Sequence, residues 1–399
     1  MKICYITNLY PPHVRGGAER IVARLAREER ALGHEVHIVT SAPFKTVQFS
    51  VHTSVEGGIT IHRVFHWALF FNLHTGEHSV ATRLVNLAWS LVNVGFAWRV
   101  ARTLRQMRPD VVHTHNLAGT SFLIPAVLKS LRVRHIHTVH DVQLAVASGR
   151  LCAGDEFDWI HAGPLARGFQ FIQRALWGSP NVVTAPSSWL LDYYKSKKFF
   201  PYSKLQLVRH YFGAPVAART EFPHAHISRT KFTLLFVGQI ERSKGVLMLI
   251  RIFSELSSRG ELADAELVVA GTGEDLKSAE ILASPCPAIH VVGDMDSSRV
   301  AHMMRAADVV VVPSLLYENS PTVIVEALSL GRPVSVSDIG GAAELVKEFD
   351  GGWSVAPNEA AWKDHIRWLS NNRSSVVQKV PLVSLADSAK EFEKLYATH

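Results

Sequence analysis

Short apolar segments alternate with helical segments along almost the whole chain, and this alternation limits the folds that it can adopt. The segment Asp308–Ser314, which contains four consecutive valines, is typical of a parallel strand that is buried on both faces. Strands are expected at 2–7, 35–40, 59–64, 110–115, 134–139, 181–185, 205–210, 232–237, 265–270, 288–292, 308–313, 333–337 and 352–355. Helices are expected at 17–32, 79–107, 187–197, 243–258, 296–305, 321–330, 341–348 and 359–371.

This order of elements predicts βαβ units, and therefore an α/β protein with two doubly wound, Rossmann-like parallel sheets. We expect an N-terminal domain at 1–215, a C-terminal domain at 216–378, and a last helix within 379–399 that is able to pack back on the first domain. The polar segment 213–230 is the expected linker. Because ligands bind at the carboxyl ends of parallel strands, two facing domains would form a deep cleft there.

Size and cysteine content narrow the class of protein. A chain of 399 residues that is 47% hydrophobic and 19% charged is long enough for two or three packed domains. Cys4, Cys152 and Cys286 are far apart, which excludes a disulfide framework and favours a reducing, cytoplasmic location. The amino terminus does not have the pattern of a signal peptide. The apolar stretch Leu84–Trp98 is shorter than a bilayer span.

The net charge of +7 is unevenly distributed. Residues 1–215 contain 24 Lys and Arg against 12 Asp and Glu, whereas residues 216–399 contain 18 against 23. The first half therefore favours anionic surroundings. Its basic residues are not interleaved with aromatic residues as in RNA-binding motifs, so no nucleic-acid partner is expected. The inner face of an anionic membrane, or a phosphate-bearing acceptor, fits this charge.

The segment 79–107 allows two interpretations. It carries Trp89, Phe96 and Trp98, followed by arginines at 99, 102, 105 and 108. An amphipathic helix that lies on an acidic membrane would have this composition. A helix that faces the core and ends in a solvated basic turn would have it too, and the sequence leaves both open.

Two glutamates eight residues apart mark the best candidate site. Glu318 is expected in the loop that follows the valine-rich strand. Ser320 and Pro321 are the expected N-cap and first residue of the next helix, which places Glu326 about a turn and a half into it. A carboxylate within the apolar run around Glu326 costs free energy unless it has a partner. We therefore favour a pair that faces a ligand over a pair on the helix surface.

Glycine-rich and basic loops follow other predicted strands. Gly16 and Gly17 precede a helix, where free amides can bind an anion, although an ordinary flexible turn has the same composition. Arg242 and Lys244 lie between a strand end and a helix start, where they could hold a diphosphate or be solvated loop charges. Neither loop has the glycine spacing of a dinucleotide-binding fingerprint or a P-loop.

Histidines are dense in the first half, and such a density can indicate a metal site. The patterns His113–His115 and His135–His137 place imidazoles on one face of a strand, but no cysteine accompanies them. No metal is therefore expected there. His140 followed by Asp141 at a strand end can orient a substrate or move a proton, or it can be structural. Asp294 and Asp296 form a D-x-D pattern that is expected to cap the helix after it.

Together these segments resemble the family-4 retaining glycosyltransferases with the GT-B fold, and the resemblance covers nearly the whole chain. It rests on the motifs at Gly16–Gly17, His113–His115, Thr138–Asp141, Gly238–Gly245, Gly271–Gly273 and Glu318–Glu326. It implies transfer of a sugar, with hexosyl transfer favoured, from a UDP- or GDP-sugar with retained anomeric configuration. The implied acceptor is a glycan or a lipid-linked molecule in cell-surface polysaccharide biosynthesis. The resemblance implies no cofactor and no metal.

The resemblance also implies roles for individual residues. Glu326 matches the glutamate that binds the ribose hydroxyls, Glu318 the one near the transferred sugar, and Lys244 the lysine on the diphosphate. Gly17 matches the glycine of the loop that meets the donor phosphates, and His140 the histidine near the reacting carbon. The expected catalytic residues are thus His140 and Glu318. The expected donor-binding residues are Gly16, Gly17, Arg242, Lys244, Asn319, Ser320, Pro321, Thr322 and Glu326.

Two departures and two alternatives accompany this interpretation. The segment 208–213 lacks the asparagine-containing turn that family members commonly have before the linker. Family members often have an arginine where this chain has Gln239, and Arg242 is the candidate to replace it. A non-hydrolysing nucleotide-sugar epimerase would use the same architecture without an acceptor. A non-catalytic nucleotide-sugar-binding protein would also keep the fold.

Overall fold

The computed structural model describes all residues except 48–49, 72, 74–77, 211–229, 377–386 and 398–399. The chain divides into two compact units, and each is described by itself. Unit 1 consists of Met1–Arg150, Phe157–His210 and Ala386–His399. Unit 2 consists of Leu151–Glu156 and Tyr211–Leu385. The short segment Leu151–Glu156 thus belongs to unit 2, although the sequence predicted it within the N-terminal domain.

Unit 1 is built on an eight-stranded sheet in the order β3-β4-β2-β1-β5-β6-β7-β8. The strands are β1 (Lys2–Thr7), β2 (Glu35–Ala42), β3 (Val51–Glu56), β4 (Ile59–Phe65), β5 (Val111–Thr114), β6 (Arg134–Thr138), β7 (Val182–Ala185) and β8 (Lys204–Leu207). All neighbours pair in parallel except β3, which forms an antiparallel hairpin with β4. The order of the parallel strands reverses between β1 and β5, which is where doubly wound sheets bind ligands.

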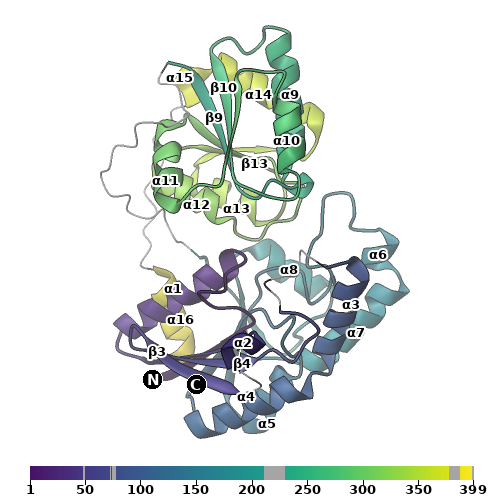
Figure 1. The fold of residues 1–399 in the computed structure, drawn as a ribbon, viewed down its shortest axis with the longest axis vertical. Coiled ribbons are helices and arrows are strands. Elements are labelled where there is room, and N and C mark those ends of the chain that lie inside the picture. Colours follow the sequence, from purple (N-terminus) through teal and green to yellow (C-terminus); the bar gives the residue numbers. More distant parts are fainter. Residues whose placement is uncertain (48–49, 72, 74–77, 211–229, 377–386, 398–399) are drawn as a thin grey trace. The chain divides into compact units, whose positions relative to one another are not determined.

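Helices connect these strands and cover the sheet (Figure 1). They are α1 (Gly17–Ala31), α2 (Phe44–Val47), α3 (Val80–Leu91), α4 (Val94–Met107), α5 (Ile124–Leu131), α6 (Trp159–Ala162), α7 (Pro164–Trp177), α8 (Ser188–Ser196) and α16 (Asp387–Ala397). The last of these comes from the end of the chain and packs against α1. Its Tyr396 hydroxyl lies 3.0 Å from that of Tyr5 and 2.8 Å from His113 Nδ1, so unit 1 contains both ends of the described chain.

Unit 2 has a six-stranded parallel sheet in the order β11-β10-β9-β12-β13-β14. The strands are β9 (Phe232–Val237), β10 (Ala265–Ala270), β11 (Ile289–Gly293), β12 (Val309–Val312), β13 (Val334–Ser337) and β14 (Gly352–Val355). This is the 3-2-1-4-5-6 order of a dinucleotide-binding sheet, and it reverses between β9 and β12. The helices are α9 (Val246–Ser258), α10 (Leu276–Ala283), α11 (Ser297–Ala306), α12 (Thr322–Ser329), α13 (Gly340–Phe349), α14 (Glu359–Asn371) and α15 (Arg373–Val376).

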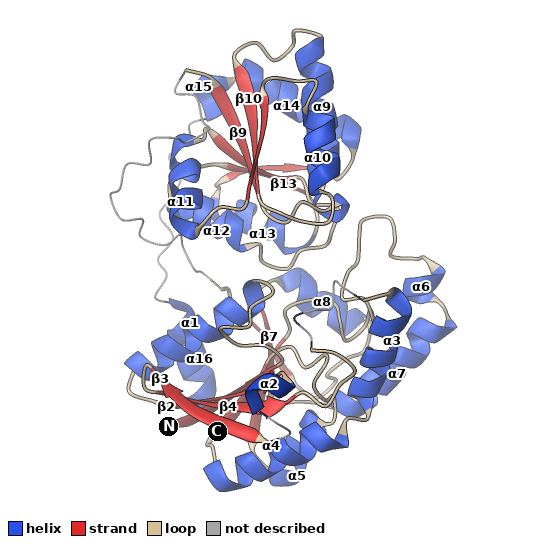
Figure 2. Cartoon of the chain, viewed as in Figure 1, coloured by secondary structure: helices blue, strands red, loops and turns tan. Residues whose placement is uncertain are grey.

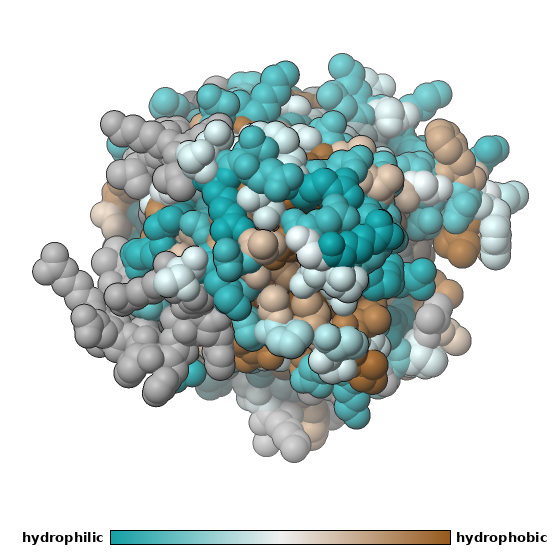
Figure 3. Space-filling view, turned by 90° about the horizontal axis from the view of Figure 1, so that it is seen from above, coloured by the Kyte–Doolittle hydropathy of each residue, from teal (hydrophilic) through white to brown (hydrophobic). Residues whose placement is uncertain are grey.

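Two apolar cores lie on opposite faces of the sheet in unit 2 (Figure 2). One contains residues of α9, α10, α14 and α15, with Trp362 fully buried in it. The other contains residues of α11, α12 and α13. Burial on both faces explains why strands such as β12 are continuous apolar runs. On the face drawn in Figure 3, hydrophilic side chains predominate and apolar ones form smaller patches between them.

The structure confirms the predicted class of two doubly wound parallel sheets. The prediction of one helix over 79–107 is wrong, because the chain breaks between α3 and α4. The Asn93 side chain accepts a hydrogen bond from Phe96 N at 3.1 Å and donates one to Thr120 O at 2.8 Å, so it caps α4 and ties the break to a loop. No single described helix has the length and apolar character to cross a bilayer. The pair Ala81–Leu91 and Val94–Met107, bent by 44°, meets those criteria only when joined, by length and composition alone.

The expected linker, 213–230, lies almost entirely outside the described residues. Strand β3 was not predicted, because its side chains are mostly exposed and show no buried alternation. Helices α5, α7 and α10 were not predicted either. In α7 the interior Gly168 counts against a helix in the sequence, and Leu165 and Phe171 are exposed apolar side chains.

Candidate functional site

In unit 2, the loops that follow β9 and β12 bring Lys244 and Glu318 together at the point where the strand order reverses. Lys244 Nζ donates to Glu318 Oε2 at 2.8 Å, and their side chains are only 21% and 15% exposed. The sequence predicted both residues as ligand contacts but did not predict this ion pair. Because it is mostly shielded from water, the pair fixes both side chains at the carboxyl edge of the sheet.

Backbone hydrogen bonds join these loops into one rigid scaffold. Leu315 N and Leu316 N both donate to Ser243 O, at 2.8 and 3.1 Å. Gly341 N, at the start of α13, donates to Glu318 O at 2.8 Å. The backbone on both sides of the ion pair is therefore held by neighbouring loops, as expected for a site whose geometry must be precise.

Gly245 lets the two loops approach closely. Its φ is +71°, and a Cβ placed on it would lie 1.9 Å from Pro313 O. Gly331 has nearly the same φ, +70°, but a Cβ there would meet nothing within 4 Å. An alanine at either position would carry similar backbone strain, and only at Gly245 would its Cβ also clash with a neighbour.

We expect Gly245→Ala to lower the free energy of unfolding of unit 2 by about 3 kcal/mol or more, since strain and clash combine. Gly331→Ala is the matched control and should cost only about 1 kcal/mol, the strain alone. Chemical denaturation of both variants checks this. Equal losses for the two variants would show that the contact with Pro313 does not matter.

Glu326 lies in the second turn of α12 and is half-buried between the buried residues Val325 and Ala327. The helix begins at Thr322 with Pro321 as its N-cap, so the predicted Ser320 cap is wrong by one residue. No side chain caps this helix start. Because α12 follows β12, its first amides and the positive end of its dipole lie at the carboxyl edge of the sheet, where Lys244 also lies.

The other predicted donor-binding residues of unit 2 lie on the same loops. Asn319 is buried, directly after Glu318. Arg242 has an exposed side chain, while its backbone N donates to Asp275 Oδ2 at 2.7 Å. The loop after β10 is thereby tied to the loop after β9, and the Arg242 guanidinium faces solvent.

In unit 1, the glycine loop after β1 differs from what the sequence predicted. Gly16 is the N-cap of α1, and its backbone N donates to Glu19 Oε2 at 2.9 Å. Glu19 is buried, so this amide already has a carboxylate partner and is not open to an added anion. The role of Gly17 in meeting donor phosphates remains a prediction.

His140 follows β6, on the same sheet edge as His115, which follows β5. His115 Nδ1 lies 2.8 Å from His140 Nε2, and the two rings stack with centroids 5.1 Å apart. Burial lowers the pKa of His140 to about 4, so the ring is neutral at neutral pH. Burial also raises the pKa of Asp141 to about 6, and its Oδ1 accepts from Gln143 N at 2.8 Å.

The position of the proton between the rings of His115 and His140 follows from the surroundings of His115. His115 is fully buried, and among the described residues its Nε2 has no hydrogen-bond partner. A buried N–H without a partner is rarer than a buried acceptor without one, so the proton of His115 belongs on Nδ1. His115 then donates to His140 Nε2, and neutral His140 carries its own proton on Nδ1. His140 is therefore a hydrogen-bond donor at its other nitrogen.

His113 and His135 take part in a buried polar network. His113 Nε2 lies 2.7 Å from Thr138 Oγ1, and His135 Nε2 lies 2.7 Å from Thr114 Oγ1. No group of three or more potential metal ligands occurs within the part of the chain that the structure describes. Asp296 caps α11 as predicted, with Oδ1 accepting from Ser298 N at 2.9 Å.

Comparison with known proteins adds to this geometry. The model of Glycosyltransferase Family 4 matches residues 15–210, and that of Glycosyl transferases group 1 matches residues 218–380. Glycogen synthase of Mycobacterium tuberculosis is 27% identical over 369 residues, 90% of this chain and 84% of that protein. The putative teichuronic acid biosynthesis glycosyltransferase TuaC of Bacillus subtilis is 24% identical over 363 residues, 86% of this chain and 83% of that protein.

The fold is also shared with solved structures. HepE of Anabaena, solved in complex with UDP, superposes with a TM-score of 0.65 at 15% identity, over 99% of this chain and all of that one. At this identity the likeness shows the fold alone. The loops after β9 and β12 thus lie on a known architecture, whereas their ligands follow from the chemistry of their own residues.

Proposed function

Because the chain belongs to the family-4 glycosyltransferases with the GT-B fold, we propose that it moves a hexosyl group from a nucleotide-sugar to an acceptor with retention of anomeric configuration. The donor is a UDP- or GDP-sugar, and it binds mainly on unit 2. The single observation that carries this proposal is the shielded Lys244–Glu318 pair at the carboxyl ends of β9 and β12.

The chemistry of the reaction fits these residues. The leaving group is a nucleoside diphosphate, so stabilising its developing negative charge is the main catalytic requirement. Lys244 supplies a fixed cation, and the uncapped start of α12 around Asn319, Ser320 and Thr322 supplies amides and a helix dipole. We propose that these groups act without a metal ion.

The other contacts follow from the same assignment. Glu326 accepts hydrogen bonds from the ribose hydroxyls, and Glu318 contacts the transferred sugar. In unit 1, neutral His140 contacts the sugar near the reacting carbon, and Gly17 lets its loop approach the donor phosphates. Arg242, exposed beside Lys244, is the second cation for the diphosphate in place of the arginine absent at Gln239.

The acceptor is proposed to be a glycan or lipid-linked molecule in cell-surface polysaccharide synthesis, at the cytoplasmic face of the membrane. The names of the two relatives, one a polysaccharide synthase and one linked to teichuronic acid, support a polymeric acceptor. The excess of basic residues in the first half supports contact with an anionic membrane. On α3, Leu84, Val85 and Trp89 are exposed apolar side chains, with Arg83 beside them.

We expect Leu84→Ser combined with Val85→Ser to reduce co-sedimentation with vesicles that contain anionic lipids. The reason is that each exposed apolar side chain contributes about 1.5–3 kcal/mol when it is buried in the lipid interface. High salt should weaken the sedimentation of the unaltered protein as well. A protein that never sediments with such vesicles would remove the membrane part of the proposal.

The transfer reaction is tested by the release of nucleoside diphosphate from a panel of UDP-, GDP- and ADP-sugars, with and without glycan or lipid-linked acceptors. We expect release from one donor, dependent on acceptor, and unchanged by a metal chelator. An epimerase would convert the donor without an acceptor, and loss of activity with chelator would contradict the proposed metal independence. Absence of release from every donor would count against the proposed transfer.

A further inference from the structure

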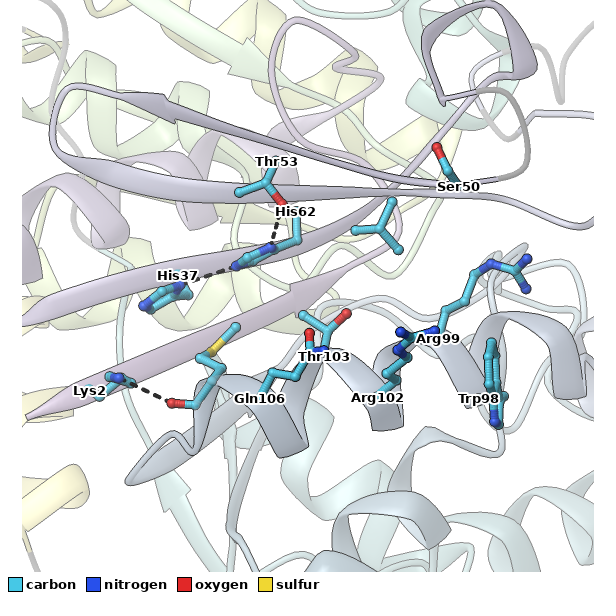
Figure 4. Close-up of a pocket in the computed structure, with 12 residues that line it drawn as sticks. Lys2, His37, Ser50, Thr53, His62, Trp98, Arg99, Arg102, Thr103 and Gln106 are labelled. Carbon is cyan, nitrogen blue, oxygen red and sulfur yellow. Dashed lines mark hydrogen bonds between the residues drawn. The ribbon is translucent and has the colours of Figure 1, made fainter.

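A cavity of about 680 Å³ lies within unit 1, between α4 and the strands β2, β3 and β4 (Figure 4). This volume is within the range of about 300–1,000 Å³ that small-ligand sites have. Lys2 and His37 lie near the amino ends of β1 and β2, whereas the candidate transferase residues follow the carboxyl ends of strands. The cavity is therefore separate from the site described above.

The cavity carries fixed positive charge. Lys2, Arg99 and Arg102 line it, and no carboxylate is present among its described lining residues. Lys2 Nζ pairs with Glu35 at 3.2 Å, so its charge is partly compensated. Arg99 Nη1 donates to Gly95 O at 3.3 Å, and Arg102 has an exposed side chain. Such a charge attracts an anionic group.

An exposed aromatic ring lies beside the two arginines. Trp98 is 54% exposed, and the guanidinium carbons of Arg99 and Arg102 each lie 5.8 Å from its ring centroid. Arg99 is also held over the Trp67 ring, at 4.6 Å. An indole face flanked by planar guanidinium groups offers a stacking surface beside hydrogen-bond donors.

The strand side of the cavity supplies neutral polar groups. His62 Nδ1 lies 3.0 Å from Thr53 Oγ1, and its Nε2 lies 3.2 Å from His37 Nδ1, as Figure 4 shows. Burial and the neighbouring His37 lower the pKa of His62 to about 4, so this ring is neutral at neutral pH. Ser50, directly before β3, adds a hydroxyl, and Gln106 of α4 adds an amide from the helix side. Both nitrogens of His62 are already engaged, so the polar groups offered to a ligand are the hydroxyls of Ser50 and Thr53 and the Gln106 amide, which can pair with sugar hydroxyls.

From this combination we propose that the cavity binds a saccharide that carries a carboxylate or a phosphate. The saccharide ring stacks on Trp98, its anionic group pairs with Arg99 and Arg102, and its hydroxyls bond with the strand side. This site is additional to the transferase site and holds a glycan without reacting with it. It rests on the cavity alone, so it stands or fails independently of the proposed transfer reaction.

Isothermal titration of the full chain tests this with three probes: a tetrasaccharide of glucuronate and N-acetylglucosamine, glucose 6-phosphate, and neutral maltotetraose. We expect an anionic probe to bind and maltotetraose to bind at least about tenfold more weakly. The double variant Arg99→Gln and Arg102→Gln should weaken binding of the anionic probe by about tenfold or more. Arg105→Gln with Lys129→Gln removes the same charge from unit 1 outside the cavity and should leave binding unchanged.

The two anionic probes separate a carboxylate ligand from a phosphate ligand. Inorganic phosphate that competes as well as either saccharide would overturn the proposal, because an anion site alone would explain it. Equal weakening by the two double variants would overturn it too. If Arg99→Gln disturbs folding, as a lowered thermal midpoint would show, Arg102→Gln alone is compared with Arg105→Gln.

Discussion

Replacing Lys244 by methionine should lower kcat/KM for sugar transfer by about 10²–10³-fold, the usual loss when one group that stabilises transition-state charge is removed. Lys244 is the cation held at the carboxyl end of β9, and it lies 2.8 Å from Glu318 in a mostly shielded place. Methionine is an unbranched side chain that is one heavy atom shorter than lysine, so it removes the charge and the hydrogen-bond donors and keeps most of the apolar stem. Steady-state kinetics with the identified donor and acceptor provide the measurement.

Two controls separate chemistry from folding. Lys277→Met removes an exposed lysine from α10 in the same unit and should leave kcat/KM unchanged. Lys244→Met also leaves Glu318 without its cation, which should cost about 1–3 kcal/mol of stability, so the thermal midpoint must be measured beside the rate. A Lys244→Met enzyme that is folded and fully active would contradict the role of Lys244.

Acid should destabilise unit 1 more strongly than unit 2. Burial lowers the pKa of His135 to about 3 and that of His140 to about 4, and it holds those of His113, His115 and His137 well below the usual value. Between pH 6.5 and these folded-state values the unfolded chain binds more protons, so stability falls as pH falls. For His135, the loss at pH 5 is about 2 kcal/mol.

Two carboxyl groups oppose this trend. Burial raises the pKa of Glu29 to about 8 and that of Asp141 to about 6, so the folded state binds more protons at these groups, and their contribution to stability grows as pH falls toward their unfolded values. They are outnumbered by the buried histidines of unit 1. In unit 2, His365 has a lowered pKa of about 4.

We therefore expect the unfolding midpoint of unit 1 to fall by about 10 °C or more between pH 7.5 and pH 5, and that of unit 2 to fall less. Calorimetry gives the midpoints, and proteolysis near the lower midpoint, with mass analysis of the fragments, identifies the unit that opens first. Fragments from unit 2 appearing first at pH 5, or a midpoint that does not change with pH, would contradict the neutral histidine network.

The strand-to-helix order could be predicted from the sequence because strands buried on both faces are continuous apolar runs. The four valines of β12 are such a run. Strand β3 could not be found, because it is an exposed edge strand whose pairing with β4 is set by tertiary contacts. The break at Asn93 was missed although its cap on Phe96 N is local, and the bond from its amide to Thr120 O joins residues that are distant in sequence.

The candidate site, too, could be predicted from the sequence only in part. Glu318 and Lys244 were predicted separately from their positions at strand ends, but residues 74 positions apart reveal a shared ion pair only in three dimensions. The proton on His140 depends on His115, which lies on another strand, and on the burial of its second nitrogen. Glu19, which occupies the Gly16 amide, is the one local contact that could have been found, because a glutamate three residues after an N-cap is a capping signal.

The position of the bound nucleotide tests the proposed donor site most directly. Hydrogen–deuterium exchange should be measured with and without the nucleoside diphosphate of the active donor. We expect slower exchange in residues 238–246 and 313–326, the loops after β9 and β12 together with the start of α12. Protection confined to α4 and the β3–β4 hairpin, or no change in either loop of unit 2, would contradict a donor site built on Lys244, Glu318 and Glu326.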